Sequence, residues 1–412
     1  MQHATKSVSR VAAAVDMLDL APNRSERTIV RLAWKSDGIT LSWDDGRTSE
    51  FHAMWLRDNC PCPECRHPQA LERTFRFIDH PEPEIQAASM PAADCVEIRF
   101  AEPEGVHVAR FAAGWLRHHC YSADARRERQ PKARLWDASA IRNLPVVHFS
   151  DYMNTDSGLR AWLEALCSWG IVLLRGVPPE PGKLLDAAHR IGPVRTSNFG
   201  EYYDVVSMPN PNAVAYTSMA LELHTDLANW RFPPDHQLLF CVKNDVVGGG
   251  SVLADGFQVA EDLRRQEPEA FRLLASLPLD FRFHDQSCDI AASAPTISLD
   301  GAGTIKRIRF NNWLRSTLSV PSEVVGPLYE ALGLFWNRLR DPRYHLTVRL
   351  QPGDLFTYDN NRVLHGRESF DPNTGHRHLQ GCYINHEDVL SKLALLDRSS
   401  LDPASLKETR AS

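Results

Sequence analysis

The first third of the chain alternates short apolar runs with turn residues. Residues 28–34 and 39–43 are strand-like and are joined by the turn sequence SDG, and a second turn, DDG, follows them. Residues 1–26 are polar without a clear apolar period, so we expect a frayed lead-in there. The pattern predicts a small β-rich domain over residues 27–135.

This β-rich domain contains an internal repeat. The segment SEFHAMWLRDNC at 49–60 is echoed by VARFAAGWLRHHC at 108–120, so that WLR and a following cysteine recur sixty residues later. Two related β-β-helix units would explain the echo, whereas a solenoid needs about three or more repeats. The arginine-rich residues 121–134 predict a solvent-facing helix before a linker, because no aromatic residues interleave with the charges as they do on a nucleic-acid surface.

The pattern of apolar positions changes from about residue 144. Helices are predicted at 158–167, 184–191, 259–277, 320–339 and 387–396, and short strands at 170–174, 237–242, 250–253, 305–310, 346–350, 355–358 and 379–384. Many short strands with a few helices are typical of a jelly roll that carries helical insertions. We therefore expect a mainly β fold with α elements over residues 144–400.

Composition and charge narrow the class of protein. Of 412 residues, 43% are apolar and 24% are charged, which is ordinary globular usage. The net charge of −6 gives no support to a nucleic-acid or membrane-surface protein. No stretch approaches the roughly 18 apolar residues that cross a bilayer. The short apolar run at 11–15 is interrupted by Asp16, which argues against a secretory signal, so we expect a soluble cytoplasmic protein.

Three of the nine cysteines lie within six positions. Cys60, Cys62 and Cys65 predict a metal site rather than disulfides, and a structural zinc site needs four ligands. His67 is near in sequence, and His107 in the second repeat could clamp the two halves together. The alternative is a group of incidental buried cysteines. The remaining cysteines are expected to be ordinary packing residues: Cys95, Cys120, Cys167, Cys241, Cys288 and Cys382.

A second cluster of possible metal ligands begins with HTD at 224–226. Alternate residues of a strand share a face, so His224 and Asp226 can bind one metal together. A third ligand could come from His236, His284, His345, His365, His376, His378 or His386. His365 is favoured because it follows a strand that ends at 358–361 and opens an irregular segment, and a histidine at a strand end beside a turn can reach into the mouth of a jelly roll. Two histidines and one carboxylate are typical of non-heme Fe(II) oxygenases.

Two further residues point to a co-substrate with a carboxylate. Arg377 lies twelve residues past His365, and an arginine can bind a carboxylate through two parallel hydrogen bonds. Ser251 follows three glycines and could donate another hydrogen bond. Iron beside a carboxylate anchor indicates 2-oxoglutarate.

These motifs resemble those of a known family. HTD at 224–226, GG-x-S at 248–251 and LHGR at 364–367 with Arg377 resemble the 2-oxoglutarate-dependent dioxygenases of the taurine dioxygenase superfamily. WLRDNCPCPEC at 55–65, AYTS at 215–218, DGF at 255–257, RFNN at 309–312 and RHLQGCY at 377–383 look like the γ-butyrobetaine and trimethyllysine dioxygenases. The resemblance covers residues 28–396.

The resemblance implies a distorted double-stranded β-helix and three groups of ligands. The implied zinc ligands are Cys60, Cys62, Cys65 and His107, the iron ligands are His224, Asp226 and His365, and the 2-oxoglutarate contacts are Arg377 and Ser251. The implied reaction couples decarboxylation of 2-oxoglutarate by O₂, which gives succinate and CO₂, to hydroxylation of an unactivated C–H bond. The family also suggests a homodimer.

The family's substrates carry a trimethylammonium group, for which an aromatic cage is the natural receptor. Tyr203, Tyr216 and Tyr383 fall on cage positions, Tyr202 and Trp230 are neighbouring possibilities, and Asn312 matches an asparagine that holds the substrate carboxylate. The sequence departs from the family pattern at Phe199, Ala213 and Leu227. The changes at Ala213 and Leu227 concern the acid end of the substrate more than its cation.

Several functions are therefore compared. The first is hydroxylation of γ-butyrobetaine to carnitine, and 2-(trimethylammonio)ethylphosphonate and trimethyllysine are the competing substrates. A further hypothesis is a 2-oxoglutarate oxygenase whose substrate is a sulfonate or an amino acid. The non-enzyme alternative is a zinc-clamped interaction module fused to an inert jelly roll.

Overall fold

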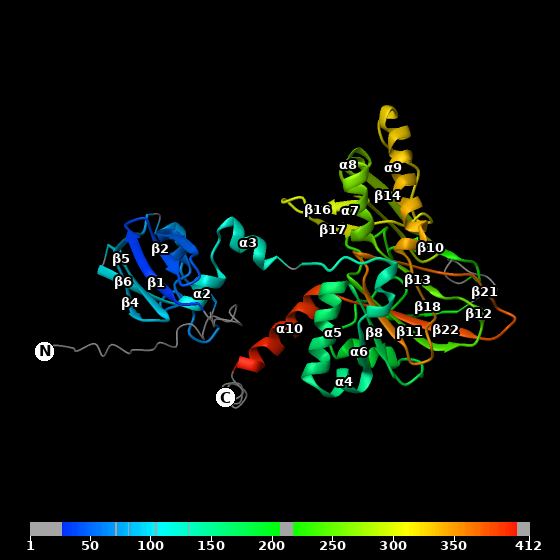
Figure 1. Cartoon of the computed structure of the whole chain (residues 1–412), viewed down its shortest axis with the longest axis horizontal. Coiled ribbons are helices and arrows are strands. Elements are labelled where there is room, and N and C mark those ends of the chain that lie inside the picture. Colours follow the sequence, from blue (N-terminus) through cyan, green and yellow to red (C-terminus); the bar gives the residue numbers. More distant parts are fainter. Residues whose placement is uncertain are drawn as a thin grey trace. The chain divides into compact units, whose positions relative to one another are not determined.

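The structure is a computed structural model that describes residues 27–401 except 71, 81, 104, 131 and 207–216. The chain divides into two compact units, with one division after Gln130 and another after Leu393 (Figure 1). Trp136 and its neighbours, which the sequence placed at the edge of a linker, are part of the second unit. Trp136 is buried there, and its backbone N–H donates to Asp255 over 3.1 Å.

The N-terminal unit is built from two similar halves. Each is a three-stranded antiparallel sheet followed by a short helix: β1 (Ile29–Lys35), β2 (Gly38–Trp43), β3 (Thr48–His52) and α1 (Ala53–Asp58), then β4 (Glu84–Ala92), β5 (Cys95–Glu102), β6 (Gly105–Ala112) and α2 (Ala113–His118). The repeat is therefore β-β-β-helix, one strand longer than the sequence suggested. Its tryptophans meet, because the rings of Trp55 and Trp115 lie 5.1 Å apart. A short η2 (Phe77–Asp79) lies between the halves, and α3 (Ala123–Arg129) follows with no buried residue, as its charges predicted.

Two facing sheets form the jelly roll of the second unit, which confirms the predicted fold class. The larger has the order β7-β8-β19-β11-β22-β9 and the smaller β10-β20-β13-β18. The bounds are β7 (Val146–His148), β8 (Ile171–Arg175), β9 (Tyr202–Val205), β10 (Leu221–His224), β11 (His236–Asn244), β13 (Ser251–Asp255), β18 (Leu346–Val348), β19 (Leu355–Asp359), β20 (Val363–Arg367) and β22 (Arg377–Ile384). A separate pair, β12 (Val247–Gly248) and β21 (Phe370–Asp371), links two loops.

Helices cover the larger sheet on one side. In Figure 1, α4 (Phe149–Asn154), α5 (Asp156–Trp169) and α6 (Lys183–His189) lie beside β8, β11 and β22. The first turn of α5 is capped by Thr155, whose hydroxyl accepts the Gly158 N–H. Short η3 (Ala138–Asn143) and η5 (Pro342–Tyr344) connect other elements, and α10 (His386–Leu401) ends the described part. No helix within that described part is long and apolar enough to span a bilayer.

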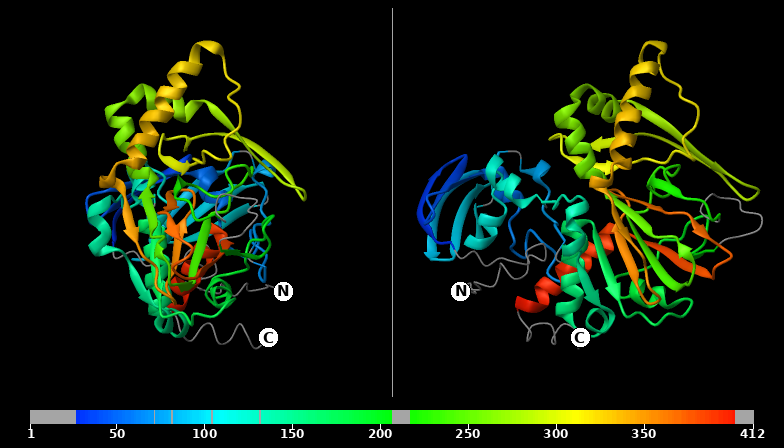
Figure 2. Two further views of the ribbon diagram at one scale, coloured as in Figure 1. Left: turned by 90° about the vertical axis from the view of Figure 1, so that its right-hand side faces the viewer. Right: turned by 45° about the vertical axis from the view of Figure 1, so that its right-hand side comes forward.

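A helical insertion carries a second apolar cluster. It contains α7 (Gly256–Gln266), α8 (Pro268–Ser276) and α9 (Ser322–Arg340), with the hairpins β14 (Pro278–His284)–β15 (Asp289–Pro295) and β16 (Ile297–Leu299)–β17 (Ile305–Ile308) (Figure 2). The single helix predicted at 259–277 is wrong. Pro268 cannot continue a helix from the preceding turn, so it begins α8 instead.

One buried ion pair ties four segments of the second unit together. The Arg362 side chain donates to both carboxylate oxygens of Asp255, over 3.0 and 2.8 Å, and both residues are almost fully buried. The same guanidinium donates to the backbone oxygens of Ser168 and Arg134. The pair therefore joins β13, the end of α5, the segment around 134 and the turn that leads into β20.

Substituting Arg362 by methionine is expected to destabilise the second unit. Removing one partner of a buried ion pair leaves the other charge uncompensated, which costs about 3–5 kcal/mol. Urea denaturation followed by tryptophan fluorescence measures the change. The control is Arg272→Ala, which breaks an exposed pair with Glu269 and is expected to leave the midpoint unchanged. Equal midpoints for both variants would contradict the assigned role of Arg362.

Candidate active site

A cavity of about 380 Å³ lies between the two sheets of the jelly roll. Strands β10, β13 and β20 of the smaller sheet and β9, β11 and β22 of the larger one contribute side chains to its wall. The β14–β15 hairpin adds Arg282, Phe283 and His284. Cavities of this size hold small ligands.

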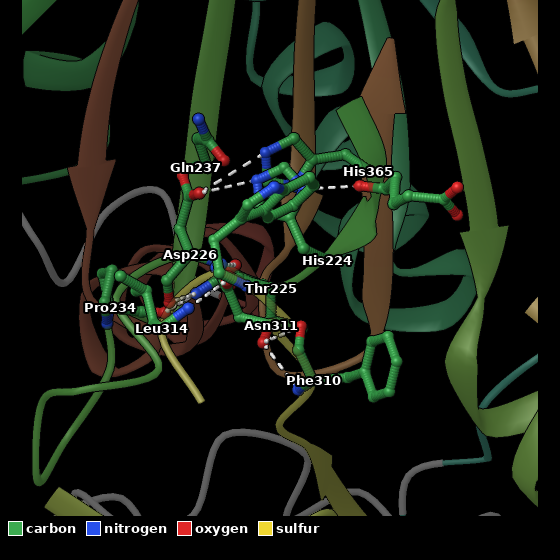
Figure 3. A network of polar contacts seen from close by, with 12 residues as sticks. His224, Thr225, Asp226, Pro234, Gln237, Phe310, Asn311, Leu314 and His365 are labelled. Carbon is green, nitrogen blue, oxygen red and sulfur yellow. Dashed lines mark hydrogen bonds and ion pairs between the residues drawn. The ribbon is translucent and has the colours of Figure 1, made fainter. Parts of the chain in front are cut away.

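Two histidines and an aspartate meet in this cavity. The pairing of β10 with β20 places His224 directly opposite His365, and their rings lie 4.4 Å apart. Oδ1 of Asp226 is 3.5 Å from Nε2 of each histidine, and both imidazoles face that carboxylate in Figure 3. The three ligand atoms all lie within 4.8 Å of one another. The sequence prediction of this trio thus corresponds to a real convergence of side chains.

The protonation states suit metal binding. His224 Nδ1 is 2.8 Å from the Glu222 carbonyl oxygen, which only accepts, so Nδ1 is the donor there and Nε2 is the nitrogen that faces Asp226. Burial raises the pKa of Asp226, but the nearby histidines and a hydrogen bond outweigh it and hold the value at about 2. Burial lowers the pKa of His365 to about 3. An ionised carboxylate and neutral imidazoles are the forms that bind a metal.

The backbone around Asp226 is held by a residue that the sequence did not single out. The buried Asn360 accepts the Asp226 N–H over 2.7 Å and donates back to the Asp226 carbonyl oxygen over 3.1 Å. Leu227, next along the chain, has φ of 51°, a left-handed conformation that non-glycine residues seldom adopt. Asn360 therefore fixes the turn on which the carboxylate stands. Its position directly after β19 was the only sequence signal for it.

Arg377 and Ser251 lie in the same cavity. Arg377 is 9% exposed, and its Nε is buried without a hydrogen-bond partner among the described residues. Burial lowers its pKa to about 10, which leaves the guanidinium charged at neutral pH. Gly249 has φ of +71°, and a Cβ there would lie 3.3 Å from that Nε, so this glycine of the GG-x-S segment makes room for the arginine. A buried, unpaired cation fits an anionic ligand such as a carboxylate.

Aromatic side chains form another part of the wall. Tyr203 and Tyr383 line the cavity with ring centroids 5.6 Å apart, and Tyr383 donates to Oδ2 of Asp226 over 2.8 Å. Phe199, Phe283 and Trp313 line it as well. Phe283 and Trp313 were missed, because the helical insertion that brings them to the cavity has no local sequence signal for the site.

Three of the other proposed substrate residues, Tyr202, Trp230 and Asn312, do not lie on the cavity wall. Tyr202 neighbours Tyr203 on β9, so strand alternation turns it to the opposite face, where it is 39% exposed. Trp230 packs against the Arg195 guanidinium, 5.7 Å from its ring. Asn312 accepts from Arg315, whereas its neighbour Asn311 lines the cavity. Tyr216 lies outside the described residues.

The three clustered cysteines converge on a histidine in the N-terminal unit. Nε2 of His107 lies 3.2, 3.7 and 3.7 Å from the sulfurs of Cys60, Cys62 and Cys65. The other candidate, His67, instead accepts the Ala70 N–H in its own turn. Cys60, Cys65 and His107 are buried, and the four residues form a group able to hold a metal ion.

Comparisons with known proteins agree with both units. Residues 129–383 match the family described as "Taurine catabolism dioxygenase TauD, TfdA family", and residues 30–103 match "Gamma-butyrobetaine hydroxylase-like, N-terminal". The γ-butyrobetaine dioxygenase of Pseudomonas sp. (strain AK-1) is 40% identical over 366 residues, which cover 88% of this chain and 94% of the relative.

More distant relatives extend the same match. The human γ-butyrobetaine dioxygenase is 35% identical over 368 residues, covering 87% of this chain and 94% of its own. The mitochondrial trimethyllysine dioxygenase of Gallus gallus is 31% identical over 377 residues, covering 88% of each chain. The chain therefore belongs to the γ-butyrobetaine and trimethyllysine dioxygenase family, and it is an Fe(II)- and 2-oxoglutarate-dependent dioxygenase of the TauD type.

Proposed function

We propose that this enzyme hydroxylates an unactivated C–H bond of a small trimethylammonium zwitterion, in the first place γ-butyrobetaine, to give carnitine. One observation carries the proposal. The cavity sets the rings of Phe199, Tyr203 and Tyr383 beside the His224–Asp226–His365 group. Asp226 is the only acidic side chain among the described residues that line it, so the rings are the receptor left for a cation.

In this proposal, different residues hold the iron, the co-substrate and the substrate. His224, Asp226 and His365 would hold Fe(II), and Arg377 and Ser251 would hold a carboxylate of 2-oxoglutarate. When bound, iron and 2-oxoglutarate supply with O₂ an oxidant that replaces C–H by C–OH and leaves succinate and CO₂. Tyr203 and Tyr383 would fix the cation, and the leucines that line the cavity, Leu221, Leu239 and Leu379, would keep water from the reacting C–H bond.

A second substrate is favoured by a specific observation at the cavity wall. Asn312, the expected partner of a carboxylate, is not on that wall, whereas the His284 imidazole and the Arg282 guanidinium, which also pairs with Asp289, are. Such groups suit an acid that is larger and more highly charged. The second candidate is therefore 2-(trimethylammonio)ethylphosphonate, and trimethyllysine is a third.

Both main substrates can be tested in one assay. Purified protein with Fe(II), 2-oxoglutarate and O₂ is expected to form succinate and a product one oxygen heavier in equal amounts. Comparing kcat/KM for γ-butyrobetaine and for the phosphonate identifies the preferred acid group. His365→Ala is the control and is expected to lose both products. Succinate without any hydroxylated trimethylammonium compound would contradict the proposed function.

Replacing Arg377 by glutamine is expected to raise the KM for 2-oxoglutarate by about 30-fold or more. Losing one partner of a buried charge pair typically costs 2–5 kcal/mol of binding. Fe(II) binding is expected to remain, because Arg377 is not among the three grouped ligands. Arg377→Lys keeps the charge but not the planar fork, so its KM should lie between those of the wild type and Arg377→Gln. An unchanged KM in Arg377→Gln would remove this residue from the co-substrate site.

We also propose that Cys60, Cys62, Cys65 and His107 hold one structural Zn²⁺. A tetrahedral zinc with ordinary bond lengths separates sulfur from nitrogen by about 3.5 Å, close to the spacing of the side chains. Metal analysis of the purified chain is expected to find one zinc, and Cys62→Ser should lose it and melt at a lower temperature. Cys95→Ser changes a buried cysteine of the same unit that is outside the cluster, and it should retain the zinc. Absence of zinc from the wild type would contradict the assignment.

A further inference from the structure

Strand β10, which carries His224, lies at the edge of the smaller sheet. The order of that sheet is β10-β20-β13-β18, so β20 pairs with β10 on one side only. The register of this pair is irregular between Leu221 and His224, and Thr225 and Asp226 lie beyond the end of the strand. An edge strand has a row of backbone groups that its sheet leaves unpaired. The jelly roll therefore holds two of the proposed iron ligands from one side, and another element has to support their other side.

A segment of the helical insertion bonds to the chain just after β10. We call residues 309–311, which directly follow β17, the RFN segment. The Thr225 N–H donates to the Phe310 carbonyl oxygen over 2.8 Å, and the Phe310 N–H donates to the Thr225 hydroxyl over 3.1 Å (Figure 3). Nδ2 of Asn311 donates to the Thr225 carbonyl oxygen over 3.2 Å. Both backbone groups of Thr225 and its hydroxyl are thus bonded to the RFN segment.

Two asparagines hold opposite ends of one peptide group. The peptide between Thr225 and Asp226 has its oxygen bonded to Asn311, and its N–H donates to Oδ1 of Asn360 over 2.7 Å. Asn311 presents its nitrogen to this oxygen, because its own Oδ1 accepts two backbone N–H groups of the segment that follows it. Both asparagines are buried. Holding the peptide at both ends restricts ψ of Thr225 and φ of Asp226, and with them the position of the carboxylate.

Arg309 holds the rest of the turn. Its buried guanidinium donates to the carbonyl oxygens of Ala228 and Arg231 over 3.1 and 3.2 Å. Leu227 lies just before these carbonyls and has the left-handed φ of 51°. Such a conformation costs free energy and persists only where the surrounding contacts hold it. The RFN segment therefore helps to keep a strained turn in the shape that presents Asp226.

The RFN segment is itself anchored at its beginning. The Arg309 N–H donates to the Thr296 carbonyl oxygen over 2.8 Å, which fixes the segment to the insertion. The Ile308 N–H donates to the Asn361 carbonyl oxygen over 2.7 Å, in the turn that leads into β20. Phe310 is buried in the apolar cluster of the insertion. The support behind the proposed ligands is therefore tied both to the insertion and to the jelly roll.

We propose that the RFN segment makes the helical insertion part of the iron site, with Asn311 as a positioning residue that acts on the Asp226 carboxylate through the peptide between Thr225 and Asp226. The inference rests on the proposed function, in which His224, Asp226 and His365 hold Fe(II). Residues that orient a metal ligand change metal affinity by about 10–100-fold when they are substituted. The insertion then determines the affinity for iron in addition to lining the cavity.

The first test compares Asn311→Ala with Asn312→Ala. Both variants remove an amide from the same motif, but Asn312 accepts from Arg315 instead of bonding to the turn. Anaerobic titration with Fe(II) in the presence of 2-oxoglutarate, followed by the visible absorption of the bound pair, measures the Kd for Fe(II). We expect this Kd to rise by about tenfold or more in Asn311→Ala and to stay unchanged in Asn312→Ala.

A second pair of variants removes one hydroxyl at nearly constant side-chain size. Thr225→Val removes the acceptor of the Phe310 N–H, and it should raise the Kd for Fe(II) in the same direction as Asn311→Ala. Thr357→Val removes a buried hydroxyl that has no hydrogen-bond partner among the described residues, and it should leave the Kd unchanged. Both variants replace a buried threonine by valine, so a difference in Kd reports the position of the ligands rather than a general loss of stability.

Hydrogen exchange of the metal-free protein gives a readout that needs no iron. The N–H groups of Thr225 and Asp226 are hydrogen-bonded, so they are expected to exchange slowly in the wild type. Peptides covering residues 221–231 should exchange faster in Asn311→Ala, whereas Asn312→Ala should match the wild type. If this difference appears but the wild type binds no Fe(II), the assignment of the iron ligands fails and the support of the turn by Asn311 stands. An unchanged Kd in folded Asn311→Ala, or an equal rise in Asn312→Ala, would overturn the inference.

Discussion

The antiparallel pairing of β10 with β20 sets His224 across from His365 and keeps both imidazoles on one face of a sheet. The turn after β10, which contains Asp226, then brings this carboxylate to the same place, although His365 follows it by more than a hundred residues in the sequence. The other parts of the site support this pairing. Asn360 clamps the backbone of Asp226, and the Arg362–Asp255 pair anchors the turn from which β20 begins. Any shift of register between these strands would separate the ligands.

The two sheets of the jelly roll have different tasks. The smaller sheet contributes the histidines, while the larger sheet contributes Arg377 and the tyrosines of the cavity wall. The hydrogen bond from Tyr383 to Asp226 connects these two groups of residues across the cavity. In the N-terminal unit, a loop of one half and a strand of the other likewise bring together four side chains that are able to hold a metal ion. Both units therefore place their candidate metal ligands where segments distant in sequence come together.

Much of the site could be predicted from local sequence, and the remainder depended on distant packing. The motifs HTD and CPCPEC each contain several residues of metal-ligating types within a few positions. A metal site can therefore be predicted from them without knowledge of the fold. The choice of Tyr203 over Tyr202 and of Asn311 over Asn312 depends on which way a strand or loop turns each side chain. Phe283 reaches the cavity only through the helical insertion. The break at Pro268 could have been read from the sequence. The homodimer and the role of Tyr216 stay predictions.

Gly381 shows that the shape of the cavity depends on a residue outside its wall. It lies on β22 directly beneath the ring of Tyr203, and any side chain there would displace that ring. The gain of a single methyl group would therefore change the aromatic part of the cavity from behind its wall. Because Gly381 does not itself line the cavity, a survey confined to wall residues would overlook it.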